Sequence, residues 1–172
     1  MVNYVKSELV KLKNTAILWN TLFFAIIAML CKIMIFTSKT NIDINTRMNI
    51  QMSLMFMVII LNTTIVINRA YNSEKDANNF QNILDNKNSL KIWNLKLSLL
   101  SVVEIIAFTL AQLFGGFIVE NLSFLGIIFA TICIQVIISI NLHMFLQLKF
   151  GDAVNILVGV IEMILVIFST NV

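Results

Sequence analysis

The sequence contains no proline and only five glycines among its 172 residues. Proline interrupts a helix because it lacks a backbone N–H, and glycine weakens one because its backbone is flexible. Charged residues are also scarce, at 12%, whereas about a quarter of the residues of a soluble domain are charged. The first shortage indicates uninterrupted helices, and the second excludes a chain that is solvated on all sides.

Cysteine and histidine are also rare: the chain has two cysteines and one histidine. Cys31 and Cys133 lie inside apolar runs, without a metal-type spacing or a secreted disulfide framework, so we expect buried free thiols. No P-loop motif is present, and a single histidine excludes the usual metalloprotease helix. A net charge of +3 is too small for a nucleic-acid footprint. The sequence therefore predicts no enzyme, no metal, no cofactor and no nucleic-acid partner.

Apolar residues make up 59% of the chain, and the mean hydropathy is +0.90. A helix of about 20 apolar residues crosses the roughly 30 Å hydrocarbon core of a bilayer. Five such runs are bounded by polar residues, and the last two connections are too short for anything but antiparallel neighbours. The predicted fold class is all-α, a polytopic integral membrane helical bundle in a lipid bilayer. Its expected transmembrane helices are 16–36, 49–68, 95–119, 122–147 and 153–170.

Basic residues predict the orientation of these helices, because they are enriched on the cytoplasmic side of a membrane. A cytoplasmic N-terminus leaves only Lys32, Lys39 and Arg47 outside, and Lys32 is close enough to its helix end to snorkel to the surface. All other basic residues then face the cytoplasm: Lys6, Lys11, Lys13, Arg69, Lys75, Lys87, Lys91, Lys96 and Lys149. We therefore expect a multi-pass protein of a cell membrane with a cytoplasmic N-terminus.

Residues 1–15 precede the first span and have an apolar stripe at helical spacing. Val2, Val5, Leu9 and Leu12 share this stripe, and lysines lie beside it. This pattern is typical of an amphipathic helix on the inner leaflet. The alternative is a charged, solvated start to the chain.

Residues 69–94 form the only long polar stretch on the expected cytoplasmic side. Ser73 resembles the N-cap of a short helix, in which Phe80, Ile83 and Leu84 would share one face. A turn cluster follows, and Trp93 would then lie at interfacial depth. We interpret this segment as a docking surface, and the alternative is an ordinary connection along the lipid headgroups.

Two short motifs resemble the membrane subunits of type 2 ABC transporters, in particular the permeases of lantibiotic (bacteriocin) self-immunity. The stretch 74–84 and the Trp93-x-x-Lys96 that follows are similar to the family's Glu, small residue, Phe-Gln-x-Leu-Leu, turn, Trp, Lys pattern. Residues 7–15 resemble the family's opening. The chain departs from the family at Ala77, where glycine is frequent, and in the turn at 87–88, where the family has proline. The family usually has six spans, so we expect this chain to lack the last one.

The resemblance implies a permease that expels an antimicrobial peptide from the bacterial plasma membrane. It implies a separate cytoplasmic ATPase, and a second permease subunit or a second copy of the chain. The residues expected to contact the ATPase are Glu74, Phe80, Gln81, Ile83, Leu84 and Trp93. Two alternatives stay open: a non-transporting adaptor or sensor for a peptide or partner protein, and a small-ion permease.

Two carboxylates lie inside the expected spans. Glu104 and Glu162 each follow a cytoplasmic helix entry by about nine residues, or roughly 13 Å. A charge at that depth costs about 2.5 to 3.5 kcal/mol on insertion scales, so each should face the bundle interior. They form a possible polar site for a cationic peptide, or they are protonated and bonded to Asn, Ser or Thr. His143 is expected nearer the helix end, outside any relay with them.

Overall fold

The computed structural model describes residues 2–14, 16–38, 42–76, 89–119 and 125–169. This part of the chain contains six α-helices and no strand. Five of the helices are long and apolar enough to cross a membrane, with mean hydropathies of 2.0 to 2.3 over their best 18 residues. The structure thus confirms the all-α membrane bundle with five expected spans.

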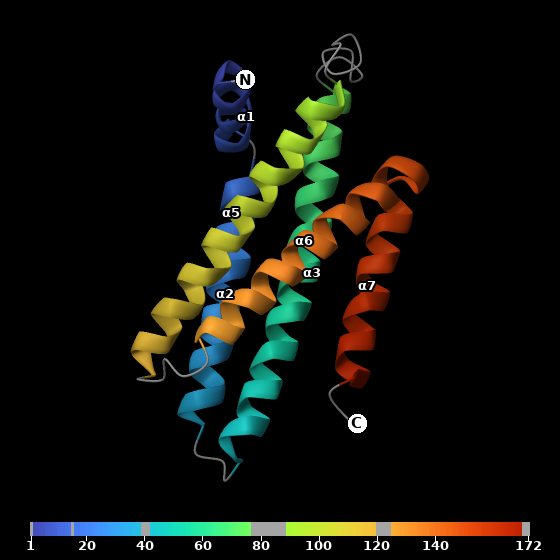
Figure 1. The fold of residues 1–172 in the computed structure, drawn as a ribbon. Coiled ribbons are helices and arrows are strands. Elements are labelled where there is room, and N and C mark those ends of the chain that lie inside the picture. The colour runs from blue at the N-terminus through green and yellow to red at the C-terminus, as the bar shows by residue number, and fades with distance from the viewer. Residues whose placement is uncertain (1, 15, 39–41, 77–88, 120–124, 170–172) are drawn as a thin grey trace.

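The helices alternate in direction along the chain (Figure 1). They are α1 (Val2–Asn14), α2 (Ile17–Thr37), α3 (Ile44–Asp76), α5 (Ser89–Ile118), α6 (Leu125–Phe150) and α7 (Asp152–Ser169). None of the five long helices is interrupted, as the lack of proline predicts. The described C-terminal end of α7 lies at the opposite end of the bundle from α1.

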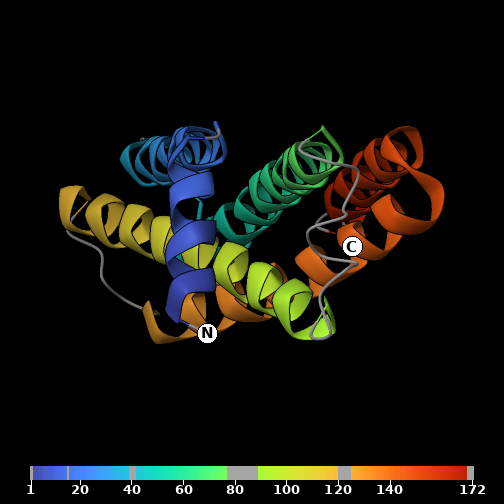
Figure 2. The same cartoon turned by 90° about the horizontal axis from the view of Figure 1, so that it is seen from above.

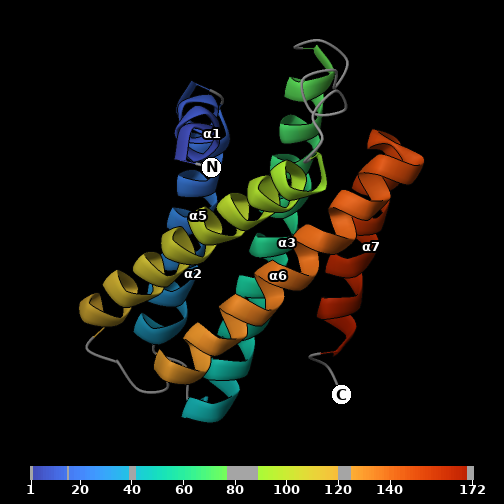
Figure 3. The same cartoon turned by 45° about the horizontal axis from the view of Figure 1, so that its top comes forward.

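The longest helix, α3, lies at the centre of the bundle. It packs against α2, α6 and α7, whereas α5 packs against α2 and α6. Apolar residues such as Ile59, Val66 and Ile67 of α3 are fully buried and form the core with Phe108 of α5 and Ile132 of α6. Figure 3 shows α6 crossing α3 obliquely and α5 crossing α2. The backbone of every long helix except α5 therefore lies close to that of α3.

Large apolar side chains cover the outside of the bundle. Trp19 is 73% exposed, Met34 71% and Phe168 66%. Soluble proteins rarely expose so much contiguous apolar surface, whereas hydrocarbon surrounds such side chains in a bilayer. The exposed residues and the lengths of the helices together indicate a membrane-embedded protein.

Helix α1 lies across one end of the bundle. Seen from above, α1 appears lengthwise while α2 is nearly end-on (Figure 2). Leu12 is buried against the bundle, whereas Leu9 and Val10 are about half exposed. We call this end of the molecule the α1 end. The exposed leucine and valine fit a helix that lies in the interface of a membrane.

Polar side chains provide hydrogen-bond partners for the backbone at the start of α3 and at the end of α2. Asp43 accepts hydrogen bonds from the backbone N–H of Thr46 at 3.0 Å and from its hydroxyl at 2.6 Å, which is the arrangement of an N-cap. These bonds lower the pKa of Asp43 from its ordinary value. The start of α3 is therefore set by a side chain that lies just outside the apolar run.

Arg47 satisfies the carbonyls at the end of α2. Its guanidinium donates to the backbone oxygens of Ile35, Phe36, Ser38 and Ile42 at 3.1 to 3.2 Å. The last carbonyls of a helix have no partner within the helix. One side chain of α3 thus joins the two helices at the end opposite α1.

Two expectations from the sequence are wrong. Lys32 does not snorkel: it is 2% exposed, its amine donates to the backbone oxygen of Gln112 at 3.1 Å, and its stem lies against Gly115. Ser73 does not begin a new helix, because α3 continues to Asp76 and the Ser73 hydroxyl donates to the oxygen of Ala70 at 2.9 Å. Packing against α5 decided the first point, and continuous helical hydrogen bonding decided the second.

We predict that Arg47→Ala lowers the free energy of unfolding by about 1 to 2 kcal/mol, because four carbonyl oxygens lose a charged donor. Unfolding in detergent micelles measures this. Arg47→Lys is the matched control: it keeps the charge but lacks the planar set of donors, so it should recover only part of the loss. A loss below about 0.5 kcal/mol for Arg47→Ala, the size of an ordinary surface effect, would contradict the capping role.

Candidate functional site

Polar side chains on α3 face two sides of the bundle. One set points toward α5 and includes Gln51, Thr63 and Glu74. The other set points toward α6 and α7 and includes Thr64, Asn68 and Asn72. Hydrocarbon offers no hydrogen-bond partners, so these groups need partners inside the protein. The candidate site is built from those partners.

At the α1 end, the carboxylate of Glu74 holds two lysines. Its Oε1 lies 2.7 Å from the amine of Lys96 and 2.9 Å from that of Lys11. Lys11 also bonds to Glu8 at 2.8 Å, and Lys96 bonds to the backbone oxygen of Ala70 at 3.1 Å. We call Glu8, Lys11, Glu74 and Lys96 the Glu74 cluster. Glu74 and Lys96 are both almost fully buried.

The Glu74 cluster ties together three helices. Lys11 lies on α1, Glu74 near the end of α3, and Lys96 in the second turn of α5. Burial alone would lower the pKa of Lys11, but the hydrogen bonds and charges of Glu8 and Glu74 outweigh it and raise this pKa above its ordinary value of 10.5. The cluster therefore holds α1 against the two helices that flank residues 77–88.

The residues expected to contact an ATPase differ in their surroundings, and not all of them are among the described residues. Glu74 is buried, and its carboxylate is bonded within the chain. Trp93 is half-buried against the core, with the Lys96 amine 5.9 Å from its ring centre. Phe80, Gln81, Ile83 and Leu84 lie outside the described residues. The docking interpretation stays a prediction, with Glu74 and Trp93 placed at the base of the segment.

The backbones of α3 and α5 lie further apart than those of α3 and its other neighbours, and polar side chains bridge this separation. No Cα atom of α3 lies within 8 Å of a Cα atom of α5, yet Thr63 donates to Glu104 at 2.8 Å and Gln51 donates to Gln112 at 2.7 Å. The hydroxyl partner of Glu104 is of the kind that the sequence suggests. The side chain of Asn62, which is also fully buried, lies beside the same carboxyl group.

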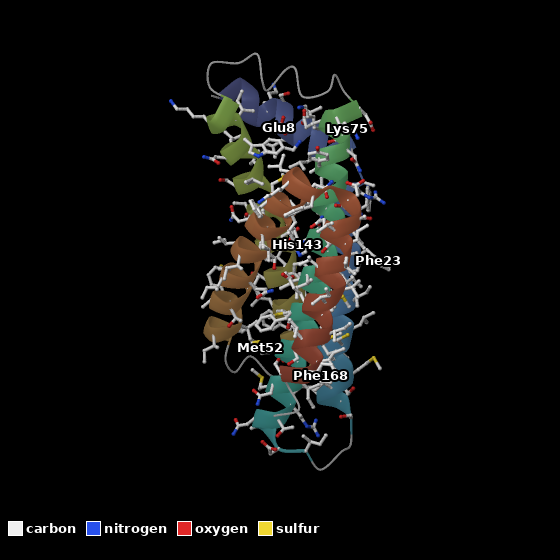
Figure 4. All side chains as sticks on the ribbon, turned by 90° about the vertical axis from the view of Figure 1, so that its right-hand side faces the viewer. Glu8, Phe23, Met52, Lys75, His143 and Phe168 are labelled. Atoms are coloured by element: carbon white, nitrogen blue, oxygen red, sulfur yellow. The ribbon has the colours of Figure 1, made fainter. Side chains whose placement is uncertain are left out.

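The other carboxylate, Glu162, lies beside His143. Its Oε2 is 3.3 Å from Nε2 of the imidazole, and Figure 4 shows His143 well inside the bundle. The expectation that His143 lies at a different depth from the carboxylates is wrong. Helix α6 runs on to Phe150, past its predicted end at 147. His143 is therefore about two turns from the end of α6, at a depth that the side chain of Glu162 reaches from α7.

Polar pairs connect α3 to α7 toward the α1 end. Asn155 donates to Asn68 at 2.6 Å, and Asn72 donates to Asp152 at 3.2 Å. Gln147 of α6 also bonds to Asp152. We call these residues, together with Thr64, His143 and Glu162, the α7 polar row. It runs from exposed Asp152 into the middle of the bundle.

Two glycines make this row possible. Gly151 has a φ of +84°, which glycine adopts readily, and its N–H bonds to the oxygen of Gln147 at 3.1 Å. The turn between α6 and α7 is therefore only one residue long. Gly159 is buried, and a Cβ there would lie 2.6 Å from the Thr64 hydroxyl. The lack of a side chain lets α7 approach α3 at the level of His143.

Sequence reasoning missed most of the α7 polar row, although a signal was present. Thr64, Asn68 and Asn72 recur every four residues, so they share one face of α3. Asp152, Asn155, Gly159 and Glu162 share a face of α7 in the same way. Polar residues at helical spacing inside an apolar run indicate a buried polar face. Only the structure shows that the two faces meet.

Comparison with known proteins adds no assignment. No family model, no curated protein and no solved structure matches the chain. Within the described residues, no group of three or more His, Cys, Asp or Glu side chains is arranged to hold a metal ion. Cys31 and Cys133 are free thiols, and both are half-buried. Functional inference therefore rests on the Glu74 cluster and the α7 polar row.

We predict that Glu74→Gln lowers the free energy of unfolding by about 3 to 5 kcal/mol, because it leaves the buried Lys96 amine without a carboxylate. Lys96→Met should lower it by less, because Lys11 still pairs with Glu74. The double variant should lose much less than the sum. Unfolding in detergent micelles measures all three variants. Lys75→Met, an exposed neighbour, should change stability by less than about 0.5 kcal/mol. Additive losses would show that Glu74 and Lys96 do not interact.

We also predict that α1 loosens at high pH. Because the folded-state pKa of Lys11 is raised, its stabilising contribution is complete below its ordinary value of 10.5 and is lost as the pH rises through the folded-state value. A spin label at Ser7→Cys should become more mobile above that pH. Lys11→Met should be mobile throughout, and Lys6→Met, on the same helix, should behave as the unchanged protein does. If the label in the unchanged protein is equally mobile below and above the folded-state pKa of Lys11, this role of Lys11 is contradicted.

Proposed function

We propose that the chain is the membrane subunit of an ABC exporter, powered by a separate cytoplasmic ATPase, that expels a lantibiotic-type peptide from the bacterial plasma membrane. The peptide and the class of exporter come from the likeness of residues 7–15 and 74–96 to that permease family. The N-terminus and the α1 end then face the cytoplasm, which agrees with the distribution of basic residues.

The Glu74 cluster is the observation that carries this proposal. An ATPase subunit transmits force to a permease through a short segment on the cytoplasmic side, and such a segment needs stiff connections to the spans. Glu74 and Lys96 join α3 to α5 through a buried ion pair of 2.7 Å, on either side of residues 77–88. A displacement of that segment would therefore act on both helices together.

Helix α1 supports the same reading. It contacts α2 and α5, and Lys11 attaches it to Glu74. A helix in the membrane interface that is ionically bound to the base of the docking segment would follow the same displacement. The permease would thus present one unit of three helices to the ATPase, and a second permease subunit or a second copy would complete the exporter.

Docking is tested by replacing the expected apolar ridge. Phe80→Asp together with Leu84→Asp should abolish co-purification with a co-expressed ABC ATPase from the same genome, because two charges would replace the apolar ridge. Asn78→Asp together with Asn82→Asp is the matched control: it adds the same two charges on the opposite face of the expected helix, so co-purification should persist. If the double variant is still captured at the level of the unchanged chain, residues 80 and 84 do not form the docking site.

Transport is tested separately in cells that express the chain and the ATPase. Growth in a series of cationic lanthionine peptides gives the resistance conferred by the pair. Replacing the P-loop lysine of the ATPase should remove that resistance, because transport needs ATP hydrolysis. Resistance that survives this change would favour a non-transporting adaptor or sensor instead.

A further inference from the structure

The hydrogen-bond partners of His143 show where a proton must lie. Its Nδ1 is 2.7 Å from Oδ1 of Asn155, and its Nε2 is 3.3 Å from both the Thr64 hydroxyl oxygen and Oε2 of Glu162. The Thr64 hydroxyl has one hydrogen, and it donates this hydrogen to the backbone oxygen of Ile60 at 2.8 Å. Thr64 therefore offers Nε2 only a lone pair.

The amide of Asn155 completes the assignment. Its nitrogen donates to Asn68 at 2.6 Å, so its oxygen faces His143, and Nδ1 must carry a hydrogen. The contact between Nε2 and Glu162 then needs a further hydrogen, either on the imidazole or on the carboxyl group. Both arrangements give the pair a net charge of zero. A low-dielectric interior favours that state over a lone carboxylate.

We propose that His143 and Glu162 form a site that binds one proton inside the bundle, and that this proton holds α7 against α3 and α6. The proton is taken from water and lies between Nε2 and Oε2. When it leaves, an imidazole lone pair faces a carboxylate. The contact then becomes repulsive, and one of the polar links from α6 to α7 is lost, while the His143–Asn155 and Gln147–Asp152 bonds remain. This inference goes beyond the proposed export function and does not depend on an ATPase.

The α7 polar row gives the site a connection to water. Asp152 is exposed at the start of α7, and its carboxylate bonds to Asn72 and Gln147. One turn further in, Asn155 bonds to both Asn68 and His143. Polar side chains of α3, α6 and α7 therefore extend from exposed Asp152 to His143.

Helix α7 is the element that such a proton would control. Of its most apolar 18 residues, 11% are buried, compared with 56% for α3. It packs on α3 and α6 alone, and its closest approach is at Gly159, directly beside Thr64 and His143. A helix with so little buried apolar surface depends strongly on its polar contacts.

Other titratable groups near the pair are already engaged or distant. On α7, Asp152 is bonded to Asn72 and Gln147, and on α6 the amine of Lys149 lies over the rings of Phe145 and Phe150. On α3, none of the described ionisable side chains is hydrogen-bonded or ion-paired to His143 or Glu162; they are Arg47, Arg69, Tyr71, Glu74, Lys75 and Asp76. Glu104 of α5 bonds to Thr63 instead. Among the described residues, no third charged side chain is in contact with the pair.

The single histidine of the chain makes a direct experiment possible. With ¹⁵N-labelled histidine, solid-state NMR of the protein in lipid bilayers reports Nδ1 and Nε2 of His143 without any assignment step. Between about pH 5 and about pH 9, Nε2 should change from a protonated or strongly hydrogen-bonded nitrogen to a bare one. Nδ1 should keep its hydrogen. A bare or unchanging Nε2 across this range would overturn the proposal.

Two variants test whether the transition comes from the His143–Glu162 pair or from the loss of any buried carboxyl group. Glu162→Gln supplies an N–H that does not titrate, so Nε2 should stay hydrogen-bonded at high pH. Glu104→Gln removes a buried carboxyl group of α5 that does not touch His143, and it should leave the transition unchanged. A transition identical in Glu162→Gln and the unchanged protein would overturn the proposal. If Glu162→Gln does not fold, the titration of the unchanged protein still decides.

The consequence for α7 is measured by the distance between two spin labels. Asn49→Cys on α3 and Phe168→Cys on α7 are exposed positions, and Cys31 and Cys133 are replaced by alanine. The distribution of distances should broaden at the pH at which Nε2 becomes bare, and it should not broaden in Glu162→Gln. Identical distributions at low and high pH would overturn the link between the proton and α7.

Discussion

Polar groups buried in a membrane bundle must find their partners inside the protein, because hydrocarbon provides none. Helix α3 concentrates this constraint, since Gln51, Asn62, Thr63 and Glu74 are all buried along it. An apolar helix of the same length could rotate or slide against its neighbours at little cost in free energy. With these side chains in place, the rotation of α3 and its register against α5 and α7 are set by hydrogen bonds.

The two sides of α3 meet the constraint in different ways. Toward α5 the backbones stay apart, and long side chains such as Gln112, Glu104 and Lys96 reach across the separation. Toward α7 the backbones come close at Gly159, and short side chains are sufficient. The first arrangement makes α3, α5 and α1 one ionically joined unit at the α1 end. The second attaches α7 through contacts that a single proton can strengthen or weaken.

Together these features describe a bundle with one stiff part and one part that can be released. The stiff part carries the base of the expected docking segment, and the releasable part carries a titratable pair at mid-depth. The proposed export function would need both properties, because force applied at the surface must open a path through the membrane.

The class of fold could be predicted from the sequence because hydropathy is additive along the chain: the five spans need only residues that adjoin one another. The predicted helix ends were less accurate, because α3 and α6 continue past the ends of their apolar runs. The partner of Glu104 was foreseen in kind, because a buried carboxyl group in an apolar span has few alternatives to a hydroxyl or amide. The burial of Lys32 and the placing of Ser73 inside α3 were not.

What the sequence by itself determined is the number of long apolar helices and the all-α class, because both depend on local composition. Which polar residues meet was decided only by the tertiary structure. Glu74 and Lys96 are separated by the segment 77–88, and His143 and Glu162 by a tight turn at Gly151. Their contacts depend on the tilt, rotation and depth of whole helices, and those quantities follow from packing among all five spans rather than from any one stretch of residues.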